Sequence, residues 1–171
     1  WPQALLALQS WGALSLLDPA LQADPRLVRR LLQAQRLQLP LLPALLAGAD
    51  QPLQLAARLQ LPQPQPRWLQ QMQELSAWLQ ANTGEDAWTG WTAEEWCDAL
   101  EQQACWGAEA VALLVIQNPP QRRPLLRWWG RWRHCTSPLT AKDLLAQGWQ
   151  PGPELGAELQ RLRRQCLRAM R

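Results

Sequence analysis

Strand signals are almost absent from this sequence, and this absence constrains the fold more than any other feature. β-Branched residues, which favour strands, form only one compact cluster, at 111–116. That cluster continues the helical spacing of Trp96 and Leu100, so it extends a helix more naturally than it begins a strand. The sequence therefore predicts an all-α fold, an irregular bundle of short helices with no sheet.

Fifteen prolines divide the chain into short helical segments. Proline lacks a backbone N–H and disfavours helical geometry in the residue before it, so it begins or ends a helix more readily than it continues one. Asp24-Pro25 and Gln51-Pro52 are typical helix starts, whereas Pro40 ends a helix. In the first third of the chain we therefore expect helices at 3–17, 25–37, 41–47 and 52–61.

Alternating prolines at 62–66 form the predicted linker inside the chain. The part before it, 1–61, is a helical segment. The part after it divides by charge into an acidic, tryptophan-rich helical segment at 67–121 and a basic helical tail at 122–171. Apolar spacing and capping residues predict five helices in these two segments, at 67–82, 92–118, 122–133, 138–145 and from Pro153 onward. The second of these begins with a predicted capping box at Thr92 and Glu95, and Gly107 is a point at which it could divide.

Charge is distributed unevenly along the chain, whose net charge is +3. Residues 68–121 contain eight acidic residues and neither lysine nor arginine, whereas 122–171 contain eleven basic residues and three acidic ones. The first 67 residues are also basic. A polyanion is therefore expected to meet the two ends of the chain rather than its middle.

The four cysteines and the single histidine do not have metal-binding or catalytic spacing. No Cys-x-x-Cys pair occurs, and neighbours in sequence such as His134 and Cys135 seldom form a catalytic pair. We therefore predict neither a metal site nor a catalytic residue in this segment. The sequence has no apolar run of membrane-spanning length and no secretory signal, so we expect a cytoplasmic protein without a membrane partner.

The segment 122–133 predicts an amphipathic, basic helix. Its apolar face combines four residues at helical spacing, Leu125, Trp128, Trp129 and Trp132. Because the chain has no phenylalanine or tyrosine, tryptophan must fill its core, and we expect core packing for these rings in preference to stacking on nucleic-acid bases. The candidate RNA contacts of this helix lie on another face: Arg123, Arg127 and Arg131.

The last helix combines a start that suits an anion with a row of arginines. Gly152 and Gly156 flank the first turn after Pro153, where free backbone N–H groups can hold a phosphate. Because arginine outnumbers lysine sixteen to one, as in GC-rich genomes, a solvated helix face is the alternative interpretation. The predicted RNA contacts opposite the leucines are Arg161, Arg164, Arg168 and Arg171.

Two stretches resemble the CCA-adding tRNA nucleotidyltransferase and poly(A) polymerase family in its bacterial, cyanobacteria-like form. Residues 140–145 (TAKDLL), followed by Gly148 and 151–156 (PGPELG), are similar to the family's tail motif of Gly-x-Asp-Leu and Pro-Gly-Pro-x-hydrophobic-Gly. Ala141 stands where the family usually has glycine. Residues 11–19 (WGALSLLDP) resemble the hydrophobic helix that follows the family's neck.

This resemblance implies a division of labour. The chain starts at Trp1 without an initiator methionine, and we expect it to be the body and tail of a longer protein, with 1–61 following the neck. The missing N-terminal head would use Mg²⁺ and CTP or ATP to add nucleotides. This segment has no Gly-Ser and no Asp-x-Asp and should be inactive alone. Its partners would be that head and tRNA. The segment would recognise the shape and the phosphates of the tRNA, and Lys142 of the tail motif would be among the contacting residues.

Two other classes of function stay open at this point. The first is a helical protein-interaction domain in which the arginines are only compositional. The second is a helix-hairpin-helix-like DNA-binding module that uses the turn at 151–156 on a phosphate. It would bind duplex DNA and tRNA equally well.

Overall fold

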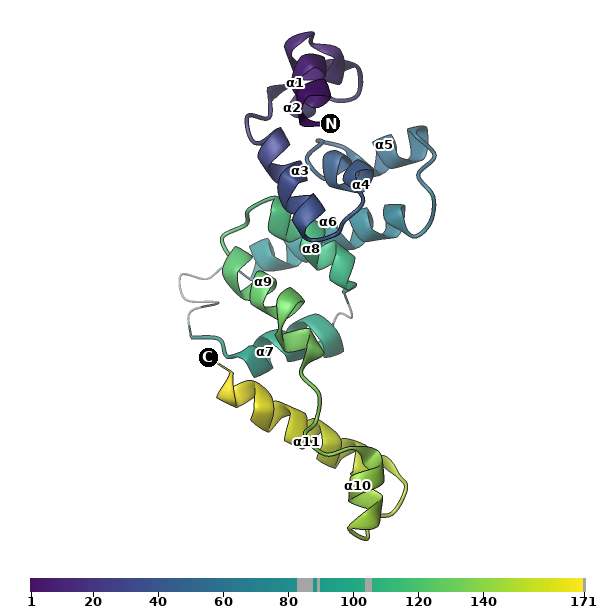
Figure 1. Ribbon diagram of the computed structural model, residues 1–171, viewed down its shortest axis with the longest axis vertical. Helices are drawn as coiled ribbons and strands as arrows, with labels where there is room; N and C mark the ends of the chain where they lie inside the picture. Colours follow the sequence, from purple (N-terminus) through teal and green to yellow (C-terminus); the bar gives the residue numbers. More distant parts are fainter. Residues whose placement is uncertain (83–87, 89, 104–105, 171) are drawn as a thin grey trace. The chain divides into compact units, whose positions relative to one another are not determined.

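The structure, a computed structural model, describes residues 1–82, 88, 90–103 and 106–170. Every regular element within these ranges is a helix (Figure 1), which confirms the predicted all-α class. The helices are short because prolines and glycines interrupt them. None of the helices in the described ranges has both the length and the apolar character needed to cross a membrane.

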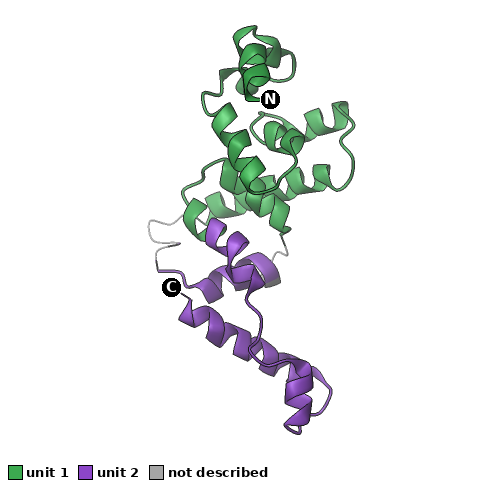
Figure 2. Ribbon diagram, in the orientation of Figure 1, with its two compact units in different colours: residues 1–87, 106–125 green, residues 88–105, 126–171 purple. Residues whose placement is uncertain are grey.

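The chain forms two compact units (Figure 2). Unit 1 contains Trp1–Ala87 and Trp106–Leu125, and unit 2 contains Trp88–Cys105 and Leu126–Arg171. The division predicted from the sequence placed a linker at 62–66 instead. In the structure the helices before and after that proline run pack on each other, because both contribute apolar side chains to the core of unit 1.

Unit 1 is built around a helix that is buried on nearly all sides. This helix, α8 (Ala108–Ile116), is apolar after its first turn and packs against α6 (Gln65–Ala81), where Leu69 and Leu75 are fully buried. Its own Val111 and Leu113 are equally buried. Three helices pack against this pair: α3 (Leu27–Arg36), α4 (Leu41–Leu46) and α5 (Pro52–Arg58). The first elements of the chain, α1 (Pro2–Ser10), η1 (Ala13–Leu16) and α2 (Pro19–Ala23), pack on one another, and α1 also contacts α3.

Two helix predictions in unit 1 were wrong. The expected helix at 3–17 is interrupted at Gly12, whose φ of +72° places it in the left-handed region that favours glycine. The chain continues as the 3₁₀ turn η1, and Leu16 is exposed. At the proline run, α6 already begins at Gln65, because Pro66 occupies the first turn, where a helix does not need its N–H.

Asp18 ties the start of α2 to a distant loop. Its carboxylate accepts a hydrogen bond from the backbone N–H of Ala20 at 2.8 Å, which caps the helix. The same carboxylate accepts a second bond from the N–H of Asp50 at 3.1 Å. These bonds account for its burial, because a buried carboxylate needs polar partners.

Unit 2 is assembled from α7 (Ala93–Cys97) and its π-helical continuation η2 (Asp98–Gln103), most of α9 (Arg122–Gly130), η3 (Trp132–His134), α10 (Ala141–Ala146) and α11 (Pro153–Ala169). Its core is rich in tryptophan: Trp96, Trp128 and Trp132 are buried. Trp88 stacks on Trp96 with 5.1 Å between the ring centroids. The expected helix at 92–118 is thus divided between the units, with Gly107 as the N-cap of α8.

Capping boxes begin two helices of unit 2. The predicted box at Thr92 and Glu95 is confirmed: the Thr92 hydroxyl accepts from the Glu95 N–H, and the Glu95 carboxylate accepts from the Thr92 N–H. Thr140 and Asp143 form the same pair at the start of α10. Each box satisfies N–H groups that the first turn of a helix leaves free.

Candidate nucleic-acid interface

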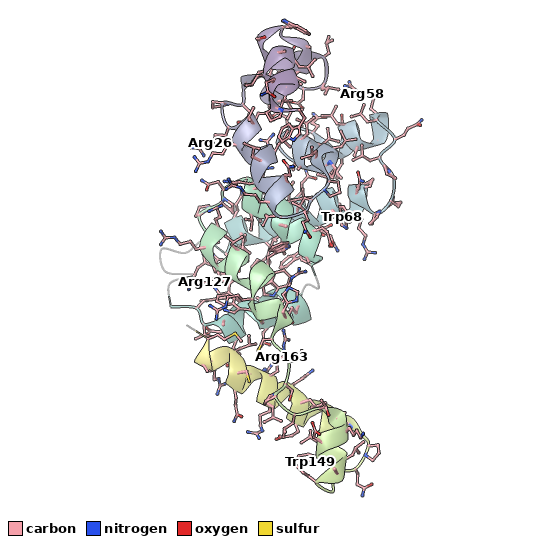
Figure 3. The ribbon with its side chains drawn as sticks, viewed as in Figure 1. Arg26, Arg58, Trp68, Arg127, Trp149 and Arg163 are labelled. Atoms are coloured by element: carbon pink, nitrogen blue, oxygen red, sulfur yellow. The ribbon has the colours of Figure 1, made fainter. Side chains whose placement is uncertain are left out.

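Three arginines form an exposed row along α9 and the residue that follows it. Arg123 and Arg127 are four residues apart, so their side chains share one face of α9, and Arg131 follows directly after the helix. All three are exposed, and none forms an ion pair with a residue that the structure describes; Figure 3 labels Arg127. We call these three residues the α9 arginine row. Its charges are available to an external anion.

The opposite face of α9 belongs to the core. Trp128 and Trp132 are buried, which confirms the prediction that these rings pack in the core and do not stack on nucleic-acid bases. The Trp128 indole N–H donates to a carboxylate oxygen of Glu101 at 2.8 Å. Trp129 is half-buried, and the Arg133 guanidinium lies 5.1 Å from its ring centroid. The packing of these rings holds the α9 arginine row at the surface.

The arginines of α11 have acidic partners, unlike those of α9. Arg164 donates to Asp98 at 3.0 Å, and Arg168 donates to Glu94 at 3.1 Å, so both contact the acidic first turns of α7 and η2. Arg161 pairs with Glu158 on its own helix. Three arginines predicted as RNA contacts on α11 therefore already have acidic partners, although Arg161 and Arg168 are still exposed, while Arg171 lies outside the described residues. The hydrogen bond from Arg161 lowers the pKa of the Glu158 carboxyl.

Arg163 makes the most extensive ion pair of unit 2, and the sequence did not single it out. Its guanidinium donates to both carboxylate oxygens of Glu101, at 2.7 and 3.0 Å, and to the Cys135 carbonyl at 2.8 Å. The hydrogen bonds to Glu101 raise the pKa of Arg163. A signal was present, because Arg163 lies four residues from Leu159 and Leu167 on the apolar side of α11. A charge at such a position indicates a partner inside the protein.

The other predicted site residues lie at the surface of unit 2. Lys142 is exposed in the first turn of α10. Gly152 caps α11 with an extended backbone, and Gly156 lies one turn into the helix. A Cβ added at either glycine would meet no atom within 4 Å. Packing within the unit therefore does not require glycine at these two positions.

Two buried thiols of unit 2, those of Cys97 and Cys135, are weak nucleophiles. Burial, reinforced by the Glu101 charge, raises the pKa of the Cys97 thiol to about 12. Burial also raises the pKa of Cys135. Both thiols stay protonated near neutral pH, and a protonated thiol is a weak nucleophile. Within the described ranges, no three His, Cys, Asp or Glu side chains are grouped so that they could hold a metal ion.

A further group of arginines lies in unit 1 and was not predicted as a site. Arg26, Arg29 and Arg30 come from α3 and its N-cap, and Arg122 begins α9. Together they line a hollow in the surface of the unit. The spacing of the first three, i, i+3 and i+4, is a signal of one shared helix face that could have been noticed in the sequence.

The chain matches no family model, no curated protein and no solved structure.

Proposed function

We propose that this chain binds RNA, as the body and tail of a tRNA nucleotidyltransferase of the CCA-adding and poly(A) polymerase family. The N-terminal head of the whole protein would bind Mg²⁺ and CTP or ATP and catalyse nucleotide addition in the cytoplasm. This chain would hold the arm of the tRNA that lies far from the growing 3′ end. By itself it would bind RNA without adding nucleotides.

The observation that carries the RNA-binding part is the α9 arginine row. Four residues of an α-helix rise about 6 Å, so the row presents positive charges at regular intervals along one line. A nucleic-acid backbone presents phosphates at regular intervals, and arginine forms bidentate hydrogen bonds with phosphate oxygens. Because no described acid pairs with these three side chains, binding RNA would break no ion pair among the described residues.

Contacts of this kind recognise shape and charge rather than base sequence. The base edges of an A-form duplex lie in a deep, narrow major groove that side chains do not enter. The tryptophans Trp128 and Trp132 are buried, so they are not available to stack on unpaired bases. We therefore expect structured RNA, such as a tRNA arm, to bind better than an unstructured single strand.

The salt dependence of tRNA binding tests the proposal. Releasing counterions from phosphates makes the logarithm of affinity fall with the logarithm of salt concentration, with a slope of about 0.7 to 0.9 for each phosphate contacted. Replacing Arg123, Arg127 and Arg131 by glutamine should lower both the affinity and this slope. The matched control replaces Arg36, Arg58 and Arg67, which carry the same charge, are exposed and lie in other helices, and should change the slope little.

Two outcomes would contradict the proposal. Affinity that does not change with salt would exclude a phosphate contact. Duplex DNA that competes as well as tRNA would favour the helix-hairpin-helix-like alternative. In that case Gly152→Ala and Gly156→Ala should weaken DNA binding, because their Cβ atoms would occupy the open space beside the helix start.

A protein-interaction role is the second candidate, favoured by a different observation. Leu6, Trp11 and Leu16 of α1, η1 and the turn between them are exposed, Trp11 by 78% and Leu16 by 80%. Exposed apolar side chains grouped on one short segment are typical of a binding surface. Replacing Trp11 and Leu16 by serine should reduce self-association or docking measured by sedimentation, with tRNA affinity unchanged. Reduced tRNA affinity in this variant would contradict a separate protein-binding surface.

A further inference from the structure

The hollow in unit 1 concentrates positive charge in a small volume. It encloses about 140 Å³, and its charged lining is made by Arg26, Arg29, Arg30 and Arg122. The first three share a face of α3, and α3 packs against α8, whose C-terminal end leads into α9. The start of α9 is thereby placed beside α3, which brings Arg122 to the other arginines; Figure 3 labels Arg26.

One acid partly balances these four charges. Asp24 forms an ion pair with Arg30, and the carbonyl of Leu45 accepts a second, longer hydrogen bond from Arg30 at 3.4 Å. Arg26, Arg29 and Arg122 form no ion pair with any residue in the described ranges. Like charges held together repel, so the hollow has an unbalanced positive field.

Two of the arginines that line the hollow have a buried donor without a hydrogen-bond partner among the described residues. Arg30 is 6% exposed, and its Nε–H has no acceptor among the described residues; the Nε–H of Arg122 is in the same condition. Burial lowers the pKa of Arg30 in spite of the Asp24 charge, so the desolvation of this guanidinium is not fully compensated. Buried polar groups are usually satisfied, and an unsatisfied pair in one hollow indicates a missing acceptor.

The chain leaves room for the buried guanidinium. A Cβ at Gly48 would overlap the Arg30 guanidinium, so only glycine fits at this position with Arg30 in place. Asn118, whose φ of +63° lies in the left-handed region that asparagine tolerates, also lines the hollow, as does Gln33. Both side chains carry amide N–H donors. The lining is therefore dominated by hydrogen-bond donors that suit an anion.

The size and donor set define the chemistry of the ligand. Pockets for drug-sized ligands have volumes of about 300 to 1,000 Å³, so this hollow suits one small group. Guanidinium forks match the oxygens of phosphate, and the three forks without an ion pair in the described ranges, those of Arg26, Arg29 and Arg122, exceed what the two oxygens of a carboxylate can accept. We propose that the hollow lined by Arg26, Arg29, Arg30 and Arg122 binds a phosphate group. The group is either a free phosphate or a phosphodiester of a nucleic-acid backbone.

Calorimetric titration of the 171-residue chain with inorganic phosphate, at constant ionic strength, tests this site. We expect saturable binding that Arg29→Gln and Arg122→Gln each weaken by about tenfold or more, because each removes charged hydrogen bonds. The control is Arg36→Gln, which removes an exposed charge from the same helix outside the hollow and should leave phosphate binding unchanged. Circular dichroism checks that each variant is folded.

A parallel titration with dimethyl phosphate distinguishes the two sources of the group. Stronger binding of inorganic phosphate assigns the site to a free phosphate or monoester, and stronger binding of dimethyl phosphate assigns it to a backbone diester. Binding of neither probe would overturn the inference, as would an equal loss in Arg36→Gln. Because both probes are small anions, a failure of tRNA binding would count against the proposed function and not against this site.

Discussion

The helices α9 and α11 are both rich in arginine, yet the arginines of α11 form ion pairs with acidic residues that the structure describes and those of the α9 arginine row do not. In α11, Arg164 and Arg168 pair with acids of α7 and η2, and Arg163 pairs with Glu101. In α9, Arg127 and the other members of the row have no acidic partner among the described residues. The difference arises because α11 packs on the acidic α7, so three of its four arginines pair with acids of other elements in the unit.

The largest expected effect concerns the apolar face of α9. Trp128→Ala should lower the free energy of unfolding by about 3 to 5 kcal/mol, because a fully buried aromatic ring is lost and the Glu101 carboxylate loses a donor. Urea unfolding followed by circular dichroism measures this change. The control Trp149→Ala removes an exposed ring of the same unit and should cost about 0.5 kcal/mol or less. Equal effects of the two substitutions would contradict the burial of Trp128.

The ion pairs of α11 should matter next. Arg163→Gln should lower the free energy of unfolding by about 1 to 3 kcal/mol, because it leaves the half-buried Glu101 carboxylate without its bidentate partner. Arg127→Gln, on the unpaired face of α9, should change it by about 0.5 kcal/mol or less. The same urea titration measures both. If Arg127→Gln were the more destabilising of the two, the claim that α11 arginines stabilise the unit and α9 arginines do not would be contradicted.

A third change would make α11 resemble α9. Glu94→Gln removes the carboxylate that pairs with Arg168 and lies 3.7 Å from Arg164, so it should free positive charge. The stability loss should be small, because the pairs are partly exposed. The salt slope of tRNA binding should rise by about 0.7 to 0.9 for each new phosphate contact. Glu154→Gln adds the same net charge without freeing an arginine and should leave the slope unchanged.

The smallest expected effect depends on pH. Arg161 lowers the pKa of Glu158 below its usual range, so the folded state holds this proton less tightly than the unfolded state does. The resulting stabilisation is present above the unfolded pKa and disappears as the pH falls through the folded pKa. The melting temperature of the protein should therefore exceed that of Glu158→Gln at neutral pH, and the two should converge in acid. A constant difference across this range would contradict the pair.

Local patterns predicted part of this structure well. The burial of Trp128 and Trp132 followed from helical spacing, and the Thr92 capping box followed from two residues three positions apart. The break at Gly12 was missed because glycine is tolerated within helices as well as between them. The hollow was missed because Arg122 lies more than ninety residues from Arg26, Arg29 and Arg30 along the chain.

The sequence by itself determined the helical class, the short lengths of the helices and the amphipathic character of α9, because these properties depend on residues within one or two turns of each other. Only the tertiary structure decided which charges are free. Whether an arginine meets Glu94, Glu101 or solvent depends on which helix packs beside it, and those partners lie 62 to 74 residues away in the chain. The same packing brought Arg122 to the arginines of α3.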